Sequence, residues 1–313
     1  MGRRKKGEKI DGWINLDKPL ELSSTQAMAK VRRALNAQKA GHAGTLDPLA
    51  SGILPIALGE ATKTIPYIQD GMKTYEFTVS WGEQRSTDDS EGDVIASSDV
   101  RPSLEQIKGA LPAFIGEIEQ IPPKFSAIKI DGERAYDLAR DGEDFEIKAR
   151  EVYIGSVELV EAREHEADLV MSCGKGTYVR ALARDLALKL GTYGYVSALR
   201  RTRVGPFNAQ EALTLEKLLA KIEELGDSAA TLDALQPLET ALDDIPAFAI
   251  KEDEAVRIRN GNEITLISKP DFERLAKAGI ENEDEALATY KGKALALVYR
   301  DGPKLKPFRV FNT

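Results

Sequence analysis

One acidic residue is marked by its surroundings. Asp47 lies in the segment Gly-His-Ala-Gly-Thr-Leu-Asp-Pro-Leu-Ala-Ser-Gly (residues 41–52) and is followed directly by Pro48. Proline disfavours helical dihedrals in the residue before it, so we expect Asp47 on an extended or turn segment with its carboxylate projecting from a loop. The flanking glycines let the backbone approach a ligand closely. A short carboxylate on such a loop suits nucleophilic or general-base chemistry, although an Asp-Pro pair also starts ordinary turns.

The rest of the composition excludes several other kinds of chemistry. The chain of 313 residues contains only two histidines, His42 and His165, and one cysteine, Cys173, so no zinc-ligand cluster can be assembled by spacing. No Gly-x-Ser-x-Gly elbow, Gly-x-Gly-x-x-Gly loop or Walker loop occurs. We therefore expect an enzyme that works with a carboxylate and with no cofactor or metal. A lone cysteine and the absence of a long apolar run predict a cytoplasmic protein that does not cross a membrane.

Charge is unevenly distributed along the chain. The net charge is −8, which by itself disfavours a polyanionic partner. However, residues 1–40 carry ten Lys/Arg against four Asp/Glu, and residues 171–206 carry seven against one. Residues 207–313 carry fourteen against twenty. Basic regions beside an acidic C-terminal third are compatible with RNA binding, although single charge runs are more often solvated helix faces.

The elements that position these residues are readable from periodicity. Residues 12–17 and 74–81 alternate apolar and polar side chains, which predicts strands. Ser23 with Gln26 forms a capping box before a helix. A helix opens near Gly176 with a buried stripe at Val179, Leu182, Leu186 and Leu190, and residues 198–204 predict a strand with a basic face. Strands near 157–159 and 169–173 suggest a hairpin.

The remaining patterns define the domain organisation. Residues 124–150 are irregular and basic, as expected for an insertion that closes over nucleic acid. Helices are predicted near 213–225 and 228–240, and residues 243–246 look like a boundary. We predict an α+β protein with a mixed, largely antiparallel sheet and flanking helices. Its catalytic domain spans residues 10–240, and a small β-rich domain spans residues 246–313.

Six motifs occur in order and together resemble one family. They are Leu16-Asp17-Lys18-Pro19, the Asp47 segment, Lys73-Thr74-Tyr75, Ser126-Ala127-x-Lys129, Gly176-Thr177-Tyr178-Val179-Arg180 and Leu199-Arg200-Arg201. The chain resembles the bacterial tRNA pseudouridine-55 synthases over roughly residues 10–215. That resemblance implies the pseudouridine synthase fold, a PUA-like RNA-binding domain at the C-terminus, and conversion of the T-loop uridine of tRNA to pseudouridine. The family shows a threonine where this chain has Arg85; we expect residues 82–92 to lie away from the Asp47 loop.

The resemblance also implies a role for each matching residue. Asp47 would be the essential catalytic carboxylate, and Arg180 would pair with it, keeping it ionised and oriented. Tyr75 would stack on the flipped uracil and take part in proton removal. Leu199 would pack against the base, Tyr178 would support the pocket, and His42 would enter the T-loop in place of a base. Contacts to RNA would come from five basic residues: Lys18, Lys63, Lys129, Arg140 and Arg200.

Several alternatives stay open at this stage. Asp47 can attack C1′, add to C6 of the base or remove a proton from C2′ to give a glycal. A non-catalytic RNA-binding or RNA-folding protein, a guide-RNA-dependent synthase subunit and a base-excising glycosylase are the competing functions. The insertion at 124–150 favours a stand-alone enzyme that acts on the tRNA T-stem-loop without guide RNA, and we expect a monomer.

Overall fold

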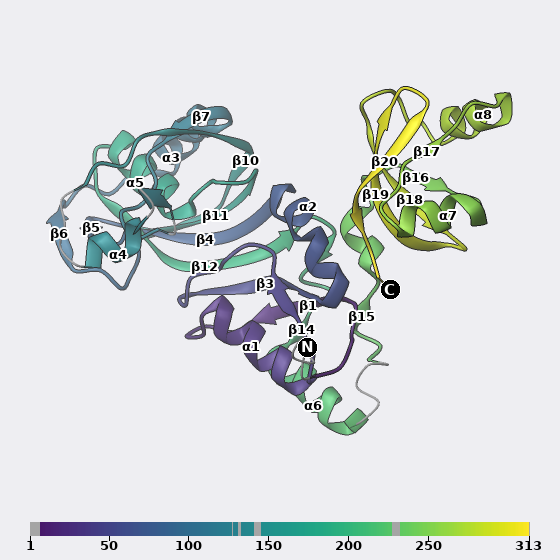
Figure 1. The fold of residues 1–313 in the computed structure, drawn as a ribbon. Coiled ribbons are helices and arrows are strands. Elements are labelled where there is room, and N and C mark those ends of the chain that lie inside the picture. The colour runs from purple at the N-terminus through teal and green to yellow at the C-terminus, as the bar shows by residue number, and fades with distance from the viewer. Residues whose placement is uncertain (1–6, 127, 131–132, 141–144, 227–231, 313) are drawn as a thin grey trace.

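The computed structural model describes residues 7–126, 128–130, 133–140, 145–226 and 232–312. It is an α+β protein with one large sheet and one small sheet (Figure 1), which confirms the predicted fold class. The large sheet follows the order β14-β1-β3-β12-β4-β11-β10-β7, and β2, β13 and β15 pair with β3, β12 and β1. Within the described part of this sheet, only the β1–β14 and β12–β3 pairs are parallel. The sheet is therefore largely antiparallel, as expected.

The strands of the large sheet have the following bounds: β1 (Gly12–Lys18), β2 (Ala40–His42), β3 (Ala50–Leu58), β4 (Lys73–Trp81), β7 (Gly116–Gln120), β10 (Arg150–Ala162), β11 (Glu166–Cys173), β12 (Gly194–Val204), β13 (Phe207–Asn208), β14 (Leu213–Thr214) and β15 (Leu235–Gln236). Two short hairpins lie beside it: β5 (Glu83–Arg85) with β6 (Val94–Ser97), and β8 (Lys129–Ile130) with β9 (Glu133–Arg134). The predicted hairpin near 157–173 is the β10–β11 pair.

Helices cover this sheet in two groups. Their bounds are α1 (Ser24–Ala34), α2 (Ile65–Asp70), α3 (Leu104–Ala110), α4 (Ala135–Arg140), α5 (Val179–Lys189) and α6 (Leu215–Leu225), with 3-10 turns η1 (Gly59–Thr64), η2 (Leu111–Phe114) and η4 (Leu238–Leu242). α1 starts at the predicted capping box, in which the Ser23 side chain accepts from the Gln26 N–H. α5 carries the predicted buried stripe. Local sequence signals thus placed these helices correctly.

The helix predicted near 228–240 is wrong where the structure describes it. Leu235 and Gln236 form β15, which pairs with Trp13 and Ile14 of β1, and a short 3-10 turn follows. Pro237 precedes that turn with extended dihedrals, because proline lacks an N–H and resists a helix interior. Pairing with β1 therefore overrides the weak helical pattern. Residues 227–231 of this prediction lie outside the described residues.

Two apolar cores meet along the large sheet, and the cavity described below lies where they meet. One contains residues of α3 and α5 against β4, β10, β11 and β12. The other contains residues of α1 and α6 against β1 and β3. Tyr75 of β4 and Leu199 of β12 pack against both cores. These two side chains therefore lie at the junction between the halves of the sheet.

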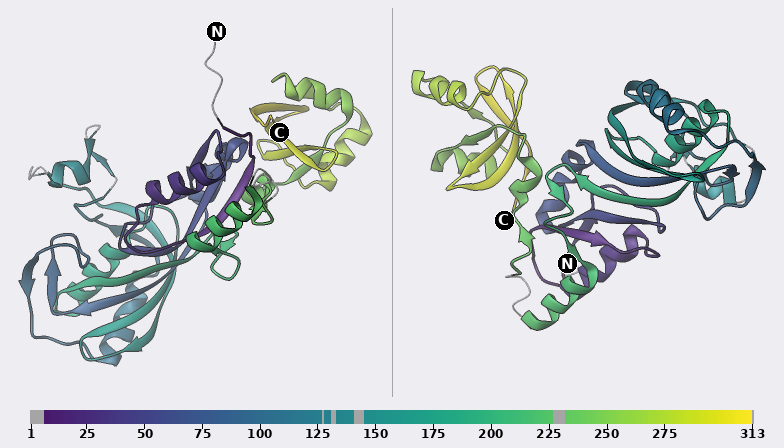
Figure 2. Two further views of the ribbon diagram at one scale, coloured as in Figure 1. Left: turned by 90° about the horizontal axis from the view of Figure 1, so that it is seen from below. Right: turned by 180° about the vertical axis from the view of Figure 1, so that it is seen from behind.

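The C-terminal part forms a separate lobe beside α2 (Figure 1, yellow and light green; Figure 2). Its curled sheet has the order β16 (Ala247–Ala249), β18 (Glu285–Tyr290), β19 (Lys293–Asp301), β20 (Lys304–Val310) and β17 (Ile264–Thr265). Helices α7 (Glu252–Arg259) and α8 (Lys269–Lys277) accompany it. The lobe is joined to the larger part by an apolar cluster that includes Ile68, Leu242, Leu287 and Leu297. The predicted β-rich C-terminal domain is present.

Candidate active site

The loop that carries Asp47 runs from β2 to β3 and is fixed from the side of α1. The Ser24 hydroxyl donates to the Leu46 carbonyl (2.9 Å) and accepts from the Leu46 N–H (2.8 Å). The Asp47 carbonyl accepts from the Ala50 N–H at 3.0 Å, which closes the turn. The Asp47 side chain is 45% exposed. The sequence expectation of a carboxylate projecting from a turn is therefore confirmed.

Arg201 fixes the same loop from the other side. Its guanidinium donates to the carbonyls of Ile53 (2.8 Å), Gly44 (3.0 Å) and Thr45 (3.4 Å), and the residue is only 1% exposed. Within the described part of the chain, no carboxylate lies within ion-pair distance of Arg201. Gly52 has φ +105°, and a Cβ there would lie 2.1 Å from the Arg201 carbonyl oxygen. Glycine is required at Gly52 because only glycine permits both this φ and this backbone contact.

Arg180, on the first turn of α5, faces Asp47. Its Nη2 lies 3.0 Å from Asp47 Oδ2, which is the contact that the family resemblance implied. The same Nη2 donates to the Phe125 carbonyl at 3.0 Å, and Nη1 donates to the Thr87 carbonyl and to Asp89 Oδ2 at 2.9 and 3.1 Å. The guanidinium is almost entirely buried. One arginine thus joins three loops.

The expectation that residues 82–92 lie away from the Asp47 loop is wrong. Thr87 and Asp89 both bind Arg180, and the Thr87 hydroxyl also donates to Asp89 Oδ1. The neighbouring Asp88 pairs with Arg184, one helical turn beyond Arg180, at 2.9 Å. Burial raises the pKa of Asp88, and the contact with Arg184 opposes that change. Two acidic residues in a turn gave no sequence signal of this role, because their arginine partners lie more than ninety residues away.

The N-terminus of α5 is held by a residue that sequence reasoning missed. Gln120, at the end of β7 and 2% exposed, accepts from the Tyr178 N–H at 2.8 Å and donates to the Tyr178 carbonyl at 3.1 Å. These two bonds fix the backbone two residues before Arg180. A glutamine that forms both bonds to one backbone residue can be found only from the tertiary structure.

A cavity of about 320 Å³ opens between these elements. Its walls come from the Asp47 loop, β4, β12, the start of α5 and the segment before β8, and the lining residues used below are Asp47, Lys73, Tyr75, Ser126, Thr177, Tyr178, Arg180, Leu199 and Arg201. The size is in the range of small-molecule sites. Asp47 is the only carboxylate that lines this cavity among the described residues.

Tyr75 and Leu199 form the apolar part of this cavity. Leu199 pairs with Phe77 on one side and with Ala50 on the other, so β12 brings it beside the Asp47 loop. Burial raises the pKa of Tyr75, and Arg201 opposes that change only in part. The Tyr75 hydroxyl therefore stays protonated at neutral pH. The predicted stacking of Tyr75 on uracil and its predicted part in proton removal both stay predictions.

His42 and Lys18 lie at the margins of the site. His42 is half-buried on β2, and its Nδ1 has no hydrogen-bond partner among the described residues. Burial lowers the pKa of His42, so the ring is neutral at neutral pH. Lys18 is fully buried and donates to the carbonyls of Pro19 (2.8 Å) and Leu22 (2.6 Å). Burial lowers its pKa to about 8, with Asp47 opposing the change.

The five basic residues predicted to contact RNA differ in exposure and in their partners within the protein. Lys18 is buried, so its predicted contact with RNA finds no support in its exposure and stays a prediction. Arg200 forms a two-bond ion pair with Asp17 (3.0 and 2.7 Å), and Lys63 binds Glu60 and the Val310 carbonyl, both at 2.6 Å. These two cations are occupied within the protein. Arg140 is exposed at the end of α4 and fits the prediction, whereas the Lys129 side chain lies outside the described part.

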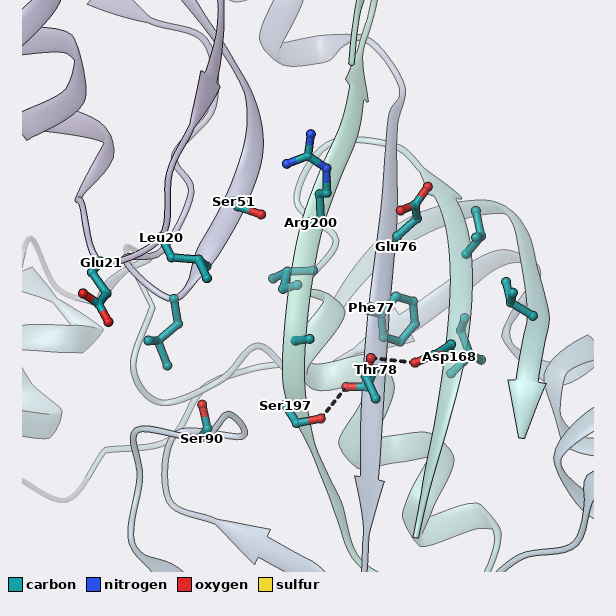
Figure 3. A pocket seen from close by; sticks show the side chains of 16 residues that line it. Leu20, Glu21, Ser51, Glu76, Phe77, Thr78, Ser90, Asp168, Ser197 and Arg200 are labelled. Carbon is teal, nitrogen blue, oxygen red and sulfur yellow. Dashed lines mark hydrogen bonds between the residues drawn. The ribbon is translucent and has the colours of Figure 1, made fainter. Parts of the chain in front are cut away.

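A second, larger cavity of about 730 Å³ lies beside the first (Figure 3). Glu76 and Thr78, which alternate with Tyr75 and Phe77 along β4, line it together with Asp168 and Glu21. Thr78 donates to Asp168 at 2.6 Å (Figure 3). Its one arginine, Arg200, already pairs with Asp17. The acidic lining disfavours RNA phosphates, so the smaller cavity is the candidate active site.

No group of three His, Cys, Asp or Glu side chains in the described ranges is placed to hold a metal ion. In the same ranges no helix is both long and apolar enough to cross a membrane.

Comparison with known proteins decides the family. Residues 32–179 match the model described as the TruB family pseudouridylate synthase N-terminal domain, and residues 180–243 match the tRNA pseudouridylate synthase B C-terminal domain. A Caulobacter vibrioides protein called tRNA pseudouridine synthase B is 54% identical over 100% of this chain and 99% of its own length. A Rhizobium etli protein of the same name is 52% identical, covering 99% and 98%. The chain belongs to the TruB family of pseudouridylate synthases.

The fold agrees with this assignment. A solved Cbf5-Nop10-Gar1 complex contains a chain that superposes with a TM-score of 0.72 at 25% identity, over 96% of this chain and 84% of that one. The resemblance drawn from the six motifs is confirmed. As a member of the TruB family, the protein is an isomerase that makes pseudouridine in tRNA. The family models end at residue 243, so the C-terminal lobe is matched through the full-length relatives and the solved structure, not through the family models.

Proposed function

We propose that this chain converts the T-loop uridine at position 55 of tRNA to pseudouridine, with Asp47 as the essential carboxylate. The observation that carries the proposal is the Asp47–Arg180 ion pair at the wall of a cavity of about 320 Å³. A carboxylate held by a buried guanidinium, yet still 45% exposed, is oriented and accessible to a ligand. Tyr75 and Leu199 offer the apolar surfaces that a planar base needs.

The reaction is balanced without a co-reactant. The N1–C1′ bond breaks, a C5–C1′ bond forms, the hydrogen leaves C5 and a hydrogen is gained at N1. The base must leave its RNA stack to reach Asp47, which costs a few kcal/mol. Stacking on Tyr75 returns about 1–3 kcal/mol of that cost. We propose that His42, neutral and half-buried beside the loop, takes the vacated position in the T-loop.

Water must be excluded while the sugar is detached from its base. Leu46 is buried behind the Asp47 turn, and Leu49 and Leu199 lie beside the carboxylate. These side chains keep the reacting carbon dry, which prevents hydrolysis to an abasic site. The same feature argues against a base-excising glycosylase, which needs water at that carbon.

We propose that RNA reaches this cavity along the insertion of residues 124–150 and the C-terminal lobe. Arg140 is exposed on α4, and the backbone of Phe125 in the adjoining segment binds Arg180 directly. In the C-terminal lobe a cavity of about 760 Å³ is lined by Arg259, Lys291 and Lys293. Arg259 and Lys291 both lie over the Tyr290 ring, at 5.3 and 5.1 Å from its centroid. Exposed cations beside an aromatic ring suit a nucleic-acid strand.

The proposal for the lobe has its own test. Replacing Arg259, Lys291 and Lys293 together by Gln should weaken tRNA binding. In a plot of log Kd against the logarithm of the salt concentration, the slope should fall by up to about 3. Activity on an isolated T-stem-loop should stay near that of the wild type. The control replaces Lys304 and Lys306, which already pair with Glu263 and Asp301. An unchanged salt slope in the triple variant would exclude this surface.

The catalytic proposal is tested with an unmodified tRNA transcript and the isolated chain, without any guide RNA. We expect release of hydrogen from C5 of the target uridine and carbodiimide-reactive pseudouridine at position 55. Asp47→Asn should lose at least about a thousandfold in rate while binding tRNA normally. Substantial hydrogen release by that variant would overturn the single-carboxylate mechanism.

The same assay separates the competing functions. Activity that appears only with guide RNA would identify a guide-dependent subunit, and free uracil among the products would identify a glycosylase. Binding and refolding of tRNA without any product would identify a non-catalytic RNA-folding protein. We further propose that the chain acts as a monomer in the cytoplasm and needs no cofactor; sedimentation of the active enzyme checks its monomeric state.

A further inference from the structure

Ser126 contributes a hydroxyl to the active-site cavity that no described residue binds with ordinary hydrogen-bond geometry. The residue is 4% exposed and lines the cavity with Asp47 and Tyr75. Its Oγ is buried and has no hydrogen-bond partner among the described residues. A buried hydroxyl without a partner is unfavourable, and proteins usually avoid it outside functional sites. A bound ligand can supply the missing hydrogen-bond partner.

The backbone around Ser126 is held close to the reacting groups. The preceding carbonyl, that of Phe125, accepts from Arg180 Nη2, the same nitrogen that contacts Asp47. The Ser126 carbonyl accepts from the Tyr136 N–H at 3.0 Å, which ties it to α4. Ser126 therefore sits on a segment fixed at both ends, one residue away from a direct contact with Arg180.

The neighbouring hydroxyl belongs to Tyr178. Burial raises the pKa of Tyr178, and a hydrogen-bonding contact with the Ser126 hydroxyl opposes that change. The two hydroxyls nevertheless form no hydrogen bond of ordinary geometry, since Ser126 Oγ stays unpartnered. The hydroxyl hydrogen of Ser126 turns by rotation about the Cβ–Oγ bond, which leaves Oγ in place.

The chemistry of the reaction creates a demand for such a donor. Attack on C1′ or glycal formation expels the base with the electron pair of the N1–C1′ bond, and addition to C6 pushes an electron pair through the ring. In each route the negative charge is delocalised onto the carbonyl oxygens of uracil. A hydrogen bond to one of these oxygens is stronger in the transition state than in the bound substrate, and such a bond accelerates the reaction.

We propose that the Ser126 hydroxyl donates to a carbonyl oxygen of the flipped uracil and stabilises the negative charge that develops there. This inference rests on the proposed function, because it requires the uridine to enter the Asp47 cavity. It makes Ser126 a further catalytic residue in a motif that the family resemblance used only as a sequence marker. The role is the same for all three routes open to Asp47.

The test uses T-stem-loop RNAs that carry uridine, 2-thiouridine or 4-thiouridine at the target position. Sulfur is a weaker acceptor than oxygen, so each analogue weakens a bond to one carbonyl. Single-turnover rates are measured by nucleoside chromatography for the wild type, Ser126→Ala and Ser126→Cys, which keeps the size but donates weakly. Ser156→Ala, a half-buried serine on β10 outside the cavity, is the matched control.

We expect Ser126→Ala to slow the uridine reaction about tenfold, with RNA affinity unchanged within about twofold. One thio analogue should slow the reaction of the wild type by a larger factor than it slows the reaction of Ser126→Ala, because the alanine variant has no hydrogen bond to that position. The rate of Ser126→Cys on the uridine RNA should lie between those of the wild type and Ser126→Ala, and the rate of Ser156→Ala should match the wild type. A general loss of folding would instead lower the rates on all three RNAs by one factor.

Equal thio penalties in the wild type and in Ser126→Ala, or an alanine variant as fast as the wild type on uridine, would overturn the inference. Absence of product from the wild type on the uridine RNA would instead overturn the proposed function. The two failures are therefore distinguishable within one set of reactions.

Discussion

Two buried arginines flank the Asp47 loop, and they are held in opposite ways. Arg180 is balanced by carboxylates, with Asp47 and Asp89 at 3.0 and 3.1 Å. Arg201 donates to carbonyl oxygens of the loop and also lies beside the Tyr75 hydroxyl, and no described carboxylate pairs with it. An arginine between carboxylates orients a reacting group, whereas an arginine bound to carbonyls holds backbone in place. We therefore expect Arg180 to act in the chemistry and Arg201 to maintain the shape of the loop.

The arginine bound to carbonyls also adds uncompensated charge. Arg201 acts to lower the pKa of Lys18, His42 and Lys73, which lie around the same loop. Burying a cation without a counter-ion is costly unless its hydrogen bonds are satisfied. The excess positive potential suits a site that must receive RNA. It is also consistent with negative charge developing on the base during the reaction.

Replacing Arg180 by Met should have the largest effect. We expect kcat/KM to fall by at least about a hundredfold, because Asp47 loses its orienting partner. The free energy of unfolding should fall by about 3–5 kcal/mol, since Asp89 is left buried and unpaired. Arg184→Met breaks the neighbouring pair with Asp88 and is the matched control. Equal activity losses in the two variants would show that Arg180 acts only through stability.

Replacing Arg201 by Lys should have the next largest effect. Lysine keeps the charge but not the planar fork that reaches Gly44 and Ile53. We expect kcat to fall by about ten- to a hundredfold with KM for tRNA nearly unchanged, because the loop that aims Asp47 loosens. The adjacent Arg200→Lys, on an arginine paired with Asp17, should be close to the wild type. A loss confined to KM would contradict the assignment.

Asp89→Asn tests how far the carboxylates around Arg180 determine its role. The amide keeps a hydrogen-bond acceptor for Arg180 but removes one of its two counter-charges. We expect a loss of about tenfold in kcat, smaller than that of Arg180→Met, because the Asp47 contact survives. Asp88→Asn, which removes the hydrogen-bonded ion pair with Arg184 instead, controls for the loop itself. If Asp89→Asn were as inactive as Asp47→Asn, Asp89 would have a direct chemical role.

The smallest expected effect is on stability and concerns Lys18. Like Arg201, this buried amine donates to backbone carbonyls. Its pKa is lowered from 10.5 to about 8, so between these values the unfolded chain binds more protons than the folded protein. The free energy of unfolding of the wild type should therefore rise with pH across this window relative to Lys18→Met. The gain should be at most about 3 kcal/mol. Urea unfolding of both proteins at pH 7 and pH 10 measures this gain. If the wild type and Lys18→Met showed the same change in unfolding free energy with pH, the burial of the Lys18 amine would be refuted.

Much of the fold was predictable from local pattern. The alternation along residues 74–81, the capping box at Ser23 and the stripe on α5 are properties of neighbouring residues. Short-range patterns report which side chains must be buried, and hence which element forms. The helix predicted near 228–240 failed because β15 is created by pairing with β1, which lies more than two hundred residues earlier.

The sequence by itself determined the family, the Asp47 turn and the order of the elements, because ordered motifs and local periodicity lie within single segments. It did not determine which of two consecutive arginines, Arg200 or Arg201, is buried behind the loop. That choice follows from the register of β12 against β3 and β4, since a shift of one residue exchanges the faces of a strand. The same holds for Asp89 and Gln120, whose partners meet them only when distant loops converge on α5.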